Sequence, residues 1–512
     1  MLPFLKSVPT KNKKQIVSFR GINYSNAYQD GDLIESLNIS TRRFPYLTAR
    51  RARMKMDAYS GATALAARDG LVVVQGTDLL YEGKVVGTVS EGEKQFAVVN
   101  TKLVIWPDKV YLDLTTQEVK PLGAKESGTG VKFSSTDGDI TVSGSEWPDL
   151  TTVFNVGDAV TISGSTKALN NATLIVKSMT KNLLSFGPGV FEDVNEAGTI
   201  TLERKIPDMD FICEANNRLF GCSSELQTLY SSAFGDPLNF NIAEGLSTDS
   251  WAVPVGSDGE FTGCCKHGSS VLFWKEARMH KLLGTYPQEY SVYEYTIEGL
   301  QKGCHKSLEV INEVLYYLGT HGVYAYSGGM PQLLSANFGE RYFKDGVAGN
   351  DGDNYYLSAW EGDECKLLVY ETKSGFWFQE DATNAVDFAR VSKDLYMLDD
   401  QGDIWLVDTR QEDKDVDWMA QFTPFHESVE GRKMFSKIIL RVELPKGAYM
   451  RVEVRYDNVR WREVGKIVGR DADSIPLQLP INRCDRFDVR LSGHGPCTIK
   501  TMLLEYAMGS DV

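Results

Sequence analysis

The stretch at residues 271–338 decides the fold, because one short pattern recurs in it. The sequence reads VLFW at 271–274, MHKLL at 279–283, VLYYL at 314–318 and VYAY at 323–326. Each apolar or aromatic run is four to six residues long and is bounded by Gly, Asn, Asp or Ser, which tolerate turn geometry. The last two runs flank a short turn that contains Gly, so they predict a β-hairpin.

Comparable strand pairs begin near seven positions of the chain. They lie near Leu71, Leu103, Leu219, Leu272, Leu315, Tyr356 and Leu395. Once residues 120–205 are set aside, these positions recur at intervals of roughly 40 residues with about four short strands each, which is typical of a β-propeller. We therefore predict an all-β fold with a propeller of six or seven blades. The N-terminal segment is a candidate donor of a closing strand.

Two segments depart from this repeat. Residues 120–205 are richer in Ser, Thr, Gly and Asn, and the run FNVGDAVTISG at 154–164 combines a Gly-Asp turn with an alternating strand. They predict a small inserted β-barrel. In the run YMRVEVRY at 449–456, apolar and charged residues alternate strictly, so one face is buried and the other is wet. Several such strands between 435 and 508 predict a β-sandwich.

The predicted domain organisation has four parts. They are a basic N-terminal arm at 1–57, the propeller at 58–119 and 206–425, the inserted β-barrel at 120–205, and the C-terminal β-sandwich at 426–512.

Charge is distributed unevenly along the chain. The formal net charge of −15 argues against a protein that clamps nucleic acid along its whole surface. Residues 1–55, however, hold 11 Lys or Arg against three acidic residues, whereas the remainder holds 43 basic and 66 acidic residues. A basic arm on an acidic body predicts docking to an acidic partner or to a neighbouring copy. The alternative is an arm that packs on its own acidic body, and both interpretations stay open here.

The candidate docking residues lie in one short segment. They are Arg42, Arg43, Phe44, Tyr46, Arg50, Arg51 and Arg53.

Motifs for catalysis and cofactor binding are missing from the sequence. It contains no phosphate-binding P-loop, no dinucleotide-binding glycine motif, no G-x-S-x-G nucleophile elbow and no H-E-x-x-H metal helix. Acidic pairs such as Asp351 with Asp353 fit a solvated surface better than an acid/base pair. We therefore predict no enzyme and no cofactor. A propeller glycosidase stays a third possibility, and it requires two carboxylates in a cleft at the blade axis.

Three smaller patterns are candidate sites. Cys264, Cys265 and His267, with Cys304 and His305, have the ligand types of a zinc site but lack C-x₂-C spacing, so we predict buried thiols and no metal.

The segment from Asp400 through Gly402 to Trp405 resembles the Asp-box turn of sialidase-type propellers, which is a structural staple. Arg455, Trp461 and Arg462 offer an aromatic face with planar donors that suits a sugar, although packing in a core or at a sheet edge explains them better.

Targeting signals are also missing. The first five residues are too short for a signal h-region, and no apolar run approaches 18 residues. The eight Cys lack the spacing of a disulfide framework. We therefore predict synthesis in a cytosol, reduced thiols and no membrane partner.

Four stretches of the chain resemble the β-propeller tail hub, or nozzle, family of short-tailed phages, which includes packaged-DNA stabilisation proteins. They are the arm ending in RRFP at 42–45, NNRLF at 216–220 leading to GDPLNF at 235–240, VLFWKEARMH at 271–280 continuing to GVYAYSG at 322–328, and RCDRFDVRL at 483–491.

The resemblance implies a structural virion protein of a phage tail. Such a protein forms a ring, commonly of six copies, that continues the DNA channel below the portal and the head-tail adaptor. The ring retains packaged DNA and passes it at ejection without sequence-specific binding, and the resemblance implies no catalysis and no cofactor. The alternative function is a glycan-binding propeller and sandwich adhesin of a phage tail or a cell surface.

Overall fold

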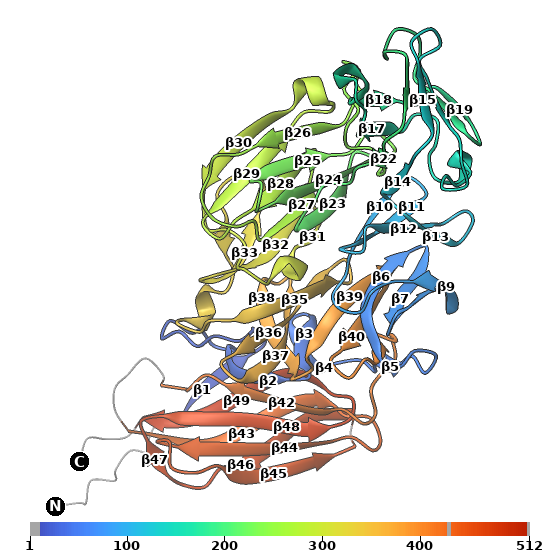
Figure 1. Ribbon diagram of the computed structural model, residues 1–512. Coiled ribbons are helices and arrows are strands. Elements are labelled where there is room, and N and C mark those ends of the chain that lie inside the picture. The colour runs from blue at the N-terminus through green and yellow to red at the C-terminus, as the bar shows by residue number, and fades with distance from the viewer. Residues whose placement is uncertain (1–10, 427–431, 470, 509–512) are drawn as a thin grey trace, which may run out of the picture. The chain divides into compact units, whose positions relative to one another are not determined.

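The computed structural model describes residues 11–426, 432–469 and 471–508, whose regular secondary structure is almost entirely β-strand (Figure 1). Five single-turn 3-10 helices are the only helical elements among these residues, at Leu150–Thr152, Ala168–Asn170, Pro287–Glu289, His305–Ser307 and Ala336–Phe338. The predicted all-β class is confirmed. No helix in the described ranges is both long enough and apolar enough to cross a membrane.

The chain divides into two compact units, and each is described by itself. The first comprises residues 1–62 and 306–512, and the second comprises residues 63–305. Together they contain seven four-stranded antiparallel sheets of the propeller, four in the second unit and three in the first. The propeller prediction is therefore confirmed, with seven blades.

The four blades of the second unit follow one another along the chain. Their strands are β6 (Ala62–Arg68), β7 (Gly70–Gln75), β8 (Asp78–Tyr81) and β9 (Lys84–Thr88); β10 (Gln95–Val99), β11 (Lys102–Trp106), β12 (Val110–Asp113) and β13 (Glu118–Pro121); β23 (Phe211–Ala215), β24 (Arg218–Ser223), β25 (Thr228–Ser231) and β26 (Trp251–Pro254); and β27 (Gly263–His267), β28 (Ser270–Trp274), β29 (Arg278–Leu283) and β30 (Ser291–Thr296).

The first strands of the last three sheets in this unit contact one another in turn, β10 with β23 and β23 with β27, which is the radial arrangement of propeller blades. Apolar side chains pack between neighbouring sheets: Phe220 and Phe273 belong to one buried cluster shared by the third and fourth blades. Burial of a large apolar side chain contributes about 1.5–3 kcal/mol relative to exposure, so these clusters hold the blades together.

The three blades of the first unit have the same layout. Their strands are β31 (Glu309–Ile311), β32 (Val314–Gly319), β33 (Gly322–Tyr326) and β34 (Gln332–Leu333); β35 (Lys344–Asn350), β36 (Asn354–Glu361), β37 (Glu364–Glu371) and β38 (Phe376–Asp381); and β39 (Ala385–Val391), β40 (Asp394–Asp399), β41 (Ile404–Leu406) and β5 (Met54–Lys55). The last blade takes its outer strand from the N-terminal segment, because Met54 pairs with Leu406.

The insertion between β13 and β23 forms two antiparallel sheets around one core. They contain β14 (Ala124–Gly128), β22 (Ile200–Arg204), β17 (Ala159–Ser163) and β18 (Thr173–Ile175) in the first sheet, and β19 (Ser178–Thr180), β20 (Leu183–Ser185), β16 (Asp139–Val142), β15 (Val131–Ser134) and β21 (Val194–Glu196) in the second. Phe133, Phe154 and Ile162 are buried in this core. The alternation at 159–163 sends Val160 and Ile162 inward, as the sequence pattern predicts.

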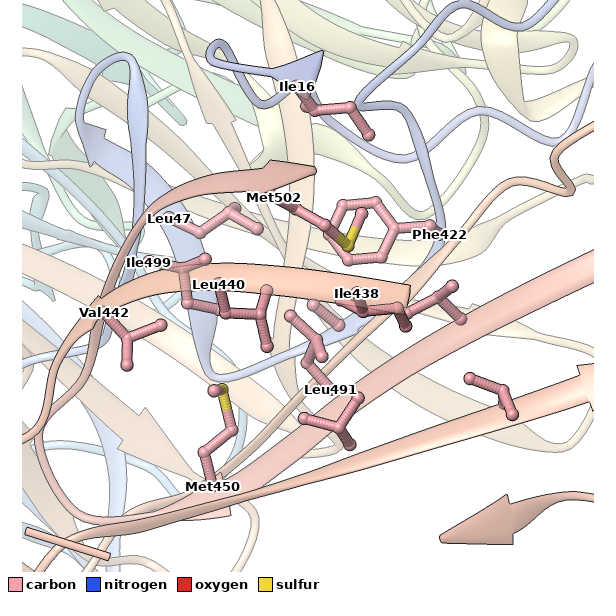
Figure 2. Packing of buried hydrophobic residues seen from close by; sticks show 14 of the residues in the cluster. Ile16, Leu47, Phe422, Ile438, Leu440, Val442, Met450, Leu491, Ile499 and Met502 are labelled. Carbon is pink, nitrogen blue, oxygen red and sulfur yellow. The ribbon is translucent and has the colours of Figure 1, made fainter. Parts of the chain in front are cut away.

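Two larger sheets form the sandwich. One contains β3 (Ile39–Arg43), β4 (Tyr46–Ala49), β49 (Thr498–Met508), β43 (Lys433–Glu443) and β46 (Asp471–Gln478), with β1 (Lys11–Ile16) and β47 (Arg483–Cys484) attached; the other contains β2 (Leu33–Leu37), β42 (Asp417–Phe422), β48 (Phe487–His494), β44 (Tyr449–Tyr456) and β45 (Arg462–Val468). Figure 2 shows their shared core, in which Leu440, Met450 and Leu491 lie between the sheets.

The N-terminal segment does not form a separate arm in the described residues, contrary to the prediction for 1–57. β1 to β4 are strands of the sandwich, and Ile16 and Leu47 point into its core (Figure 2). The C-terminal part of the sandwich begins at Asp417, before the predicted boundary at 426. Local patterns miss this arrangement because β1 and β4 both pair with β49, more than 400 residues away along the chain. Residues 1–10 of the predicted arm lie outside the described residues.

Candidate docking surface

The turn between β3 and β4 exposes three of the predicted docking residues. Phe44 is 59 % exposed and Tyr46 is 37 % exposed, while Arg43 is exposed and its side chain makes no hydrogen bond or ion pair within the described chain. The Phe19 N–H donates to the Pro45 carbonyl at 3.1 Å, so the turn is held in place. Arg, Tyr and other aromatic residues supply most binding energy at protein interfaces, so this turn is a candidate docking surface.

Arg53 is directed inward and is almost completely buried. Its Nη2 lies 2.5 Å from Glu380 Oε2, and its Nη1 lies 2.8 Å from Asp381 Oδ2. Burial acts to lower the pKa of Arg53, but the two carboxylates outweigh this effect and raise the pKa above its ordinary value. Burial likewise acts to raise the pKa of Asp381, yet Arg53 and the hydrogen bonds from Thr383 keep that pKa low. Arg53 therefore fastens the N-terminal segment to the end of β38.

The remaining three arginines also pair with acids of their own unit. Arg50 Nη1 lies 2.8 Å from Asp413, and Arg51 and Arg42 lie 3.2 and 3.4 Å from the same Asp408 oxygen. A free basic arm is thus not what the structure shows for these residues. They pack against their own acidic body, which is the alternative that the sequence left open, and their docking role stays a prediction.

A cleft of about 340 Å³ opens beside the turn. Its lining includes Arg42, Arg43, Arg50, Arg51, Arg410, Glu412, Asp413 and Glu443. Arg42 and Arg51 share Asp408, and Arg42 also lies 3.9 Å from Glu380, whereas the side chain of Arg43 has no acidic partner among the described residues; Arg43 is therefore the guanidinium group that stays available here. Arginine forms strong charge-assisted bonds to carboxylates, so the cleft could accept an acidic side chain of a partner.

A second polar surface lies on the sandwich sheet that contains β44, β45 and β48. The guanidinium carbons of Arg455 and Arg490 lie 4.7 and 4.3 Å from the centroid of the Trp461 ring. Arg490 also pairs through two nitrogens with Glu453, at 2.9 and 3.0 Å. Trp461 is half-buried, so an aromatic ring and planar hydrogen-bonding groups meet at this surface.

The sequence predicted only part of this second surface. Arg455 and Trp461 come together, but the exposed Arg462 makes no hydrogen bond or ion pair in the described ranges, and Arg490 takes its place. The pairing of β44 with β48 sets Glu453 opposite Arg490. No local sequence signal predicts that register, because the two strands are far apart along the chain.

The first strands of the last three blades carry a cluster of ionisable groups that sequence reasoning missed. Asn350 Nδ2 donates to Glu309 Oε2 at 2.6 Å, and Arg390 Nη1 donates to the Asn350 Oδ1 at 2.9 Å. Lys306 Nζ lies 3.3 Å from Asp387 Oδ2. Desolvation raises the pKa of Glu309 to about 7, the range in which a carboxyl can exchange protons at neutral pH.

Two further sequence patterns are the Cys and His group and the turn that resembles an Asp box. Within the described part of the chain, no three His, Cys, Asp or Glu side chains are positioned to hold a metal ion, and all eight Cys are free. The turn that resembles an Asp box is stapled by Asp399, whose Oδ2 accepts a hydrogen bond from Trp405 Nε1 at 2.8 Å. Asp400, the expected staple, instead accepts a hydrogen bond from Asn384.

Comparison with known proteins gives distant structural neighbours. No family model and no curated protein matches the chain. Similar solved structures include an exo-β-1,3-galactanase from Phanerochaete chrysosporium, with 9 % identity over 56 % of this chain and 92 % of that one, and a TM-score of 0.21.

Two further matches are of the same kind. The extracellular domain of a proposed one component system from B. thetaiotaomicron is 10 % identical over 90 % of this chain and 63 % of that one, with a TM-score of 0.34. A family 43 arabinoxylan arabinofuranohydrolase from Bacillus subtilis is 10 % identical over 87 % and 96 %, with a TM-score of 0.17.

These matches correct one prediction. The sequence predicted that the chain is not an enzyme, and glycoside hydrolases among the structural neighbours contradict that inference. Because the TM-scores lie below 0.5, no activity is transferred from these proteins to this chain.

Proposed function

We propose that this chain is a component of a phage tail, in which the propeller and the sandwich serve as a scaffold for assembly. The observation that carries the proposal is the exposed turn of Arg43, Phe44 and Tyr46, held on a strand pair of the sandwich core. Two exposed aromatic rings beside an unpaired guanidinium are unfavourable for a solitary protein and favourable for a docking site. The resemblance of the sequence to tail hub proteins supports the same interpretation.

In this proposal the net negative charge of the chain helps DNA to pass. A ring wall with excess negative charge repels DNA phosphates, so DNA passes without being held. The arginines near the turn are mostly neutralised by their own acids, and they therefore leave a local contact for a neighbouring tail protein rather than a broad basic surface.

Localisation in virions tests the proposal directly. Antibodies against the purified chain should label the tail of particles made by a phage that encodes it, and replacing Arg43, Phe44 and Tyr46 together by Ala should yield particles that lack the chain or its neighbour. The matched control replaces Tyr342, which is as exposed as Phe44, by Ala, and leaves particles intact. Absence of the chain from purified virions would contradict the proposal.

A second candidate function is glycan binding at the sandwich, and the Trp461 surface favours it. Sugars stack on aromatic rings, and their hydroxyls accept hydrogen bonds from planar donors such as Arg455 and Arg490. A purified chain should then bind polysaccharides of the host surface in a glycan screen. Trp461→Ala should remove that binding, while Arg462→Ala on the same sheet should keep it. Binding that persists in Trp461→Ala would exclude this surface.

A further inference from the structure

The outer strand of the fourth blade has an unpaired edge. The sheet order is β27-β28-β29-β30, so the outer side of β30 faces no other strand of the described chain. An edge strand presents a row of free N–H and C=O groups, which are a template for another strand. Soluble proteins therefore usually place Lys, Pro, a bulge or a covering segment at such an edge.

Most of the other blades have such a feature on their outer strand. β13 contains Lys120 and Pro121, and β26 ends at Pro254. β34 and β5 are only two residues long. β9 begins at Lys84, and its pairing with β8 is irregular. These edges are poor templates for a further strand.

The sixth outer strand, β38, is as long as β30, but the N-terminal segment covers its edge. The Ile22 N–H donates to the Trp377 carbonyl at 2.8 Å, and the Asn38 N–H donates to the Gln379 carbonyl at 3.2 Å. The backbone groups of β38 thus have partners within the same unit. β30 is the exception among the seven outer strands of the described blades.

Strand β30 has the properties of an interface strand. Its six residues, Ser-Val-Tyr-Glu-Tyr-Thr, include neither Lys nor Pro, and its pairing with β29 is regular throughout. Tyr293 and Tyr295 are 49 % and 43 % exposed, and Leu283, opposite Ser291, is 36 % exposed. These three side chains share one face of the sheet because they occupy alternate and directly opposed positions. The edge therefore lies beside an exposed apolar patch.

We propose that β30 docks a second copy of this chain, strand against antiparallel strand. The sequence of β30 allows self-pairing in a register centred on Tyr293. A two-fold axis perpendicular to the sheet keeps each face on the same side, so residues that oppose each other differ by an even number. The register centred on position 293 sets Tyr293 against the partner's Tyr293 and Glu294 against the partner's Val292.

That register is also the favourable one. An aromatic pair directly across two strands contributes about 0.2–1 kcal/mol relative to an alanine pair. The alternative register centred on Glu294 would oppose two like charges, which is destabilising. Because this contact is two-fold, it is separate from the head-to-tail contacts that close a ring, and it does not depend on where the protein functions.

The mass of the purified protein in solution tests the proposal. The wild-type particle should contain an even number of copies of the 57.0 kDa chain, and the double variant Tyr293→Lys with Tyr295→Lys should have half that mass. Lysine blocks edge pairing because its charge would be brought beside the same charge of the partner copy. Tyr342→Lys, at a site that is 59 % exposed and outside any strand, should leave the mass unchanged.

A cross-link tests the register. Tyr293→Cys should join two copies by a disulfide under mild oxidation, whereas Glu294→Cys and the wild type, with its eight native thiols, should not. Equal far-ultraviolet circular dichroism spectra would show that the variants are folded. A monomeric wild type over the micromolar range, or a lysine variant with the wild-type mass, would overturn the proposal. Cross-linking through Glu294→Cys alone would overturn the register.

Discussion

Arg204 and Asp158 form an ion pair in which both side chains are almost completely buried, at 4 % and 3 % exposure. Arg204 Nε also donates to the Leu122 carbonyl at 3.0 Å, and Asp158 Oδ1 accepts a hydrogen bond from Asn239 Nδ2 at 3.1 Å. Asn239 lies in the loop between β25 and β26 of the third blade. The network therefore holds the inserted domain to the propeller within one unit.

Removing one partner of this pair should destabilise the protein strongly. Asp158→Ala leaves the Arg204 guanidinium buried without a counter-charge, which costs about 3–5 kcal/mol. The double variant Asp158→Leu with Arg204→Met should recover part of that loss, because no charge stays buried, while the Leu122 carbonyl and the Asn239 amide each lose one hydrogen bond. Urea unfolding of the three proteins measures the difference. Equal stability of Asp158→Ala and the wild type would contradict the assignment.

Arg53 should contribute to stability through its two carboxylate partners. Arg53→Ala leaves the buried Glu380 and the partly buried Asp381 close together without a counter-charge, at a cost of about 3–5 kcal/mol, whereas Arg51→Ala, at a half-exposed pair, should cost about 1 kcal/mol or less.

The pH dependence tests the same contact. Because Arg53 lowers the pKa of Asp381 in the folded state, it supplies stability above the ordinary carboxyl pKa, and that stability is lost as the pH falls through the folded pKa. The free energy of unfolding should therefore fall less steeply at acid pH in Arg53→Ala than in the wild type. An equally steep fall in both proteins would mean that another group causes the loss of stability at acid pH.

Glu309 should make the protein less stable as the pH rises. Its pKa is raised from 4.5 to about 7 by desolvation, so above pH 4.5 the unfolded chain ionises this carboxyl while the folded chain does not. Stability should fall between about pH 4.5 and 7, by at most about 3 kcal/mol at 1.36 kcal/mol per pKa unit.

Glu309→Gln should remove this dependence, since an amide oxygen can still accept the Asn350 hydrogen bond without ionising. Denaturant unfolding at pH 5 and pH 8 should show the variant overtaking the wild type at the higher pH. Glu412→Gln, at an exposed site, is the control and should follow the wild type. Parallel curves for wild type and Glu309→Gln would show that Glu309 is ionised in the folded protein.

Replacing Gly402 by alanine should destabilise the protein more than the same change at a glycine with open space around it. It has φ +80°, and an added Cβ would lie 2.6 Å from the Gly61 Cα, where the N-terminal segment meets the last blade. Gly362 has φ +60° and open space around it. Gly362→Ala should cost about 1–2 kcal/mol from backbone strain alone, whereas Gly402→Ala should cost about 1–3 kcal/mol more. Thermal unfolding of the two variants separates strain from steric overlap, and equal losses would show that the backbone at Gly61 can move.

Much of the fold followed from local sequence. Runs such as VLYYL and VYAY form β32 and β33 because each strand and its turn are set by neighbouring residues. The alternation of Met450, Val452 and Val454 likewise predicted the buried face of β44. The candidate site was predicted only in part: Arg43, Phe44 and Tyr46 are exposed, whereas Arg53 is buried in an ion pair.

The sequence by itself therefore determined the strands, the repeat of four-stranded units and the inserted β domain, because these depend on periodicity over a few residues. Only the tertiary structure decided that β1 to β4 belong to the sandwich, that Arg490 and not Arg462 contacts Trp461, and that Asn350 faces Glu309. The first two depend on the register between strands far apart along the chain, and the third depends on the packing of one blade against the next. Both are selected by the burial of whole faces rather than by any local pattern.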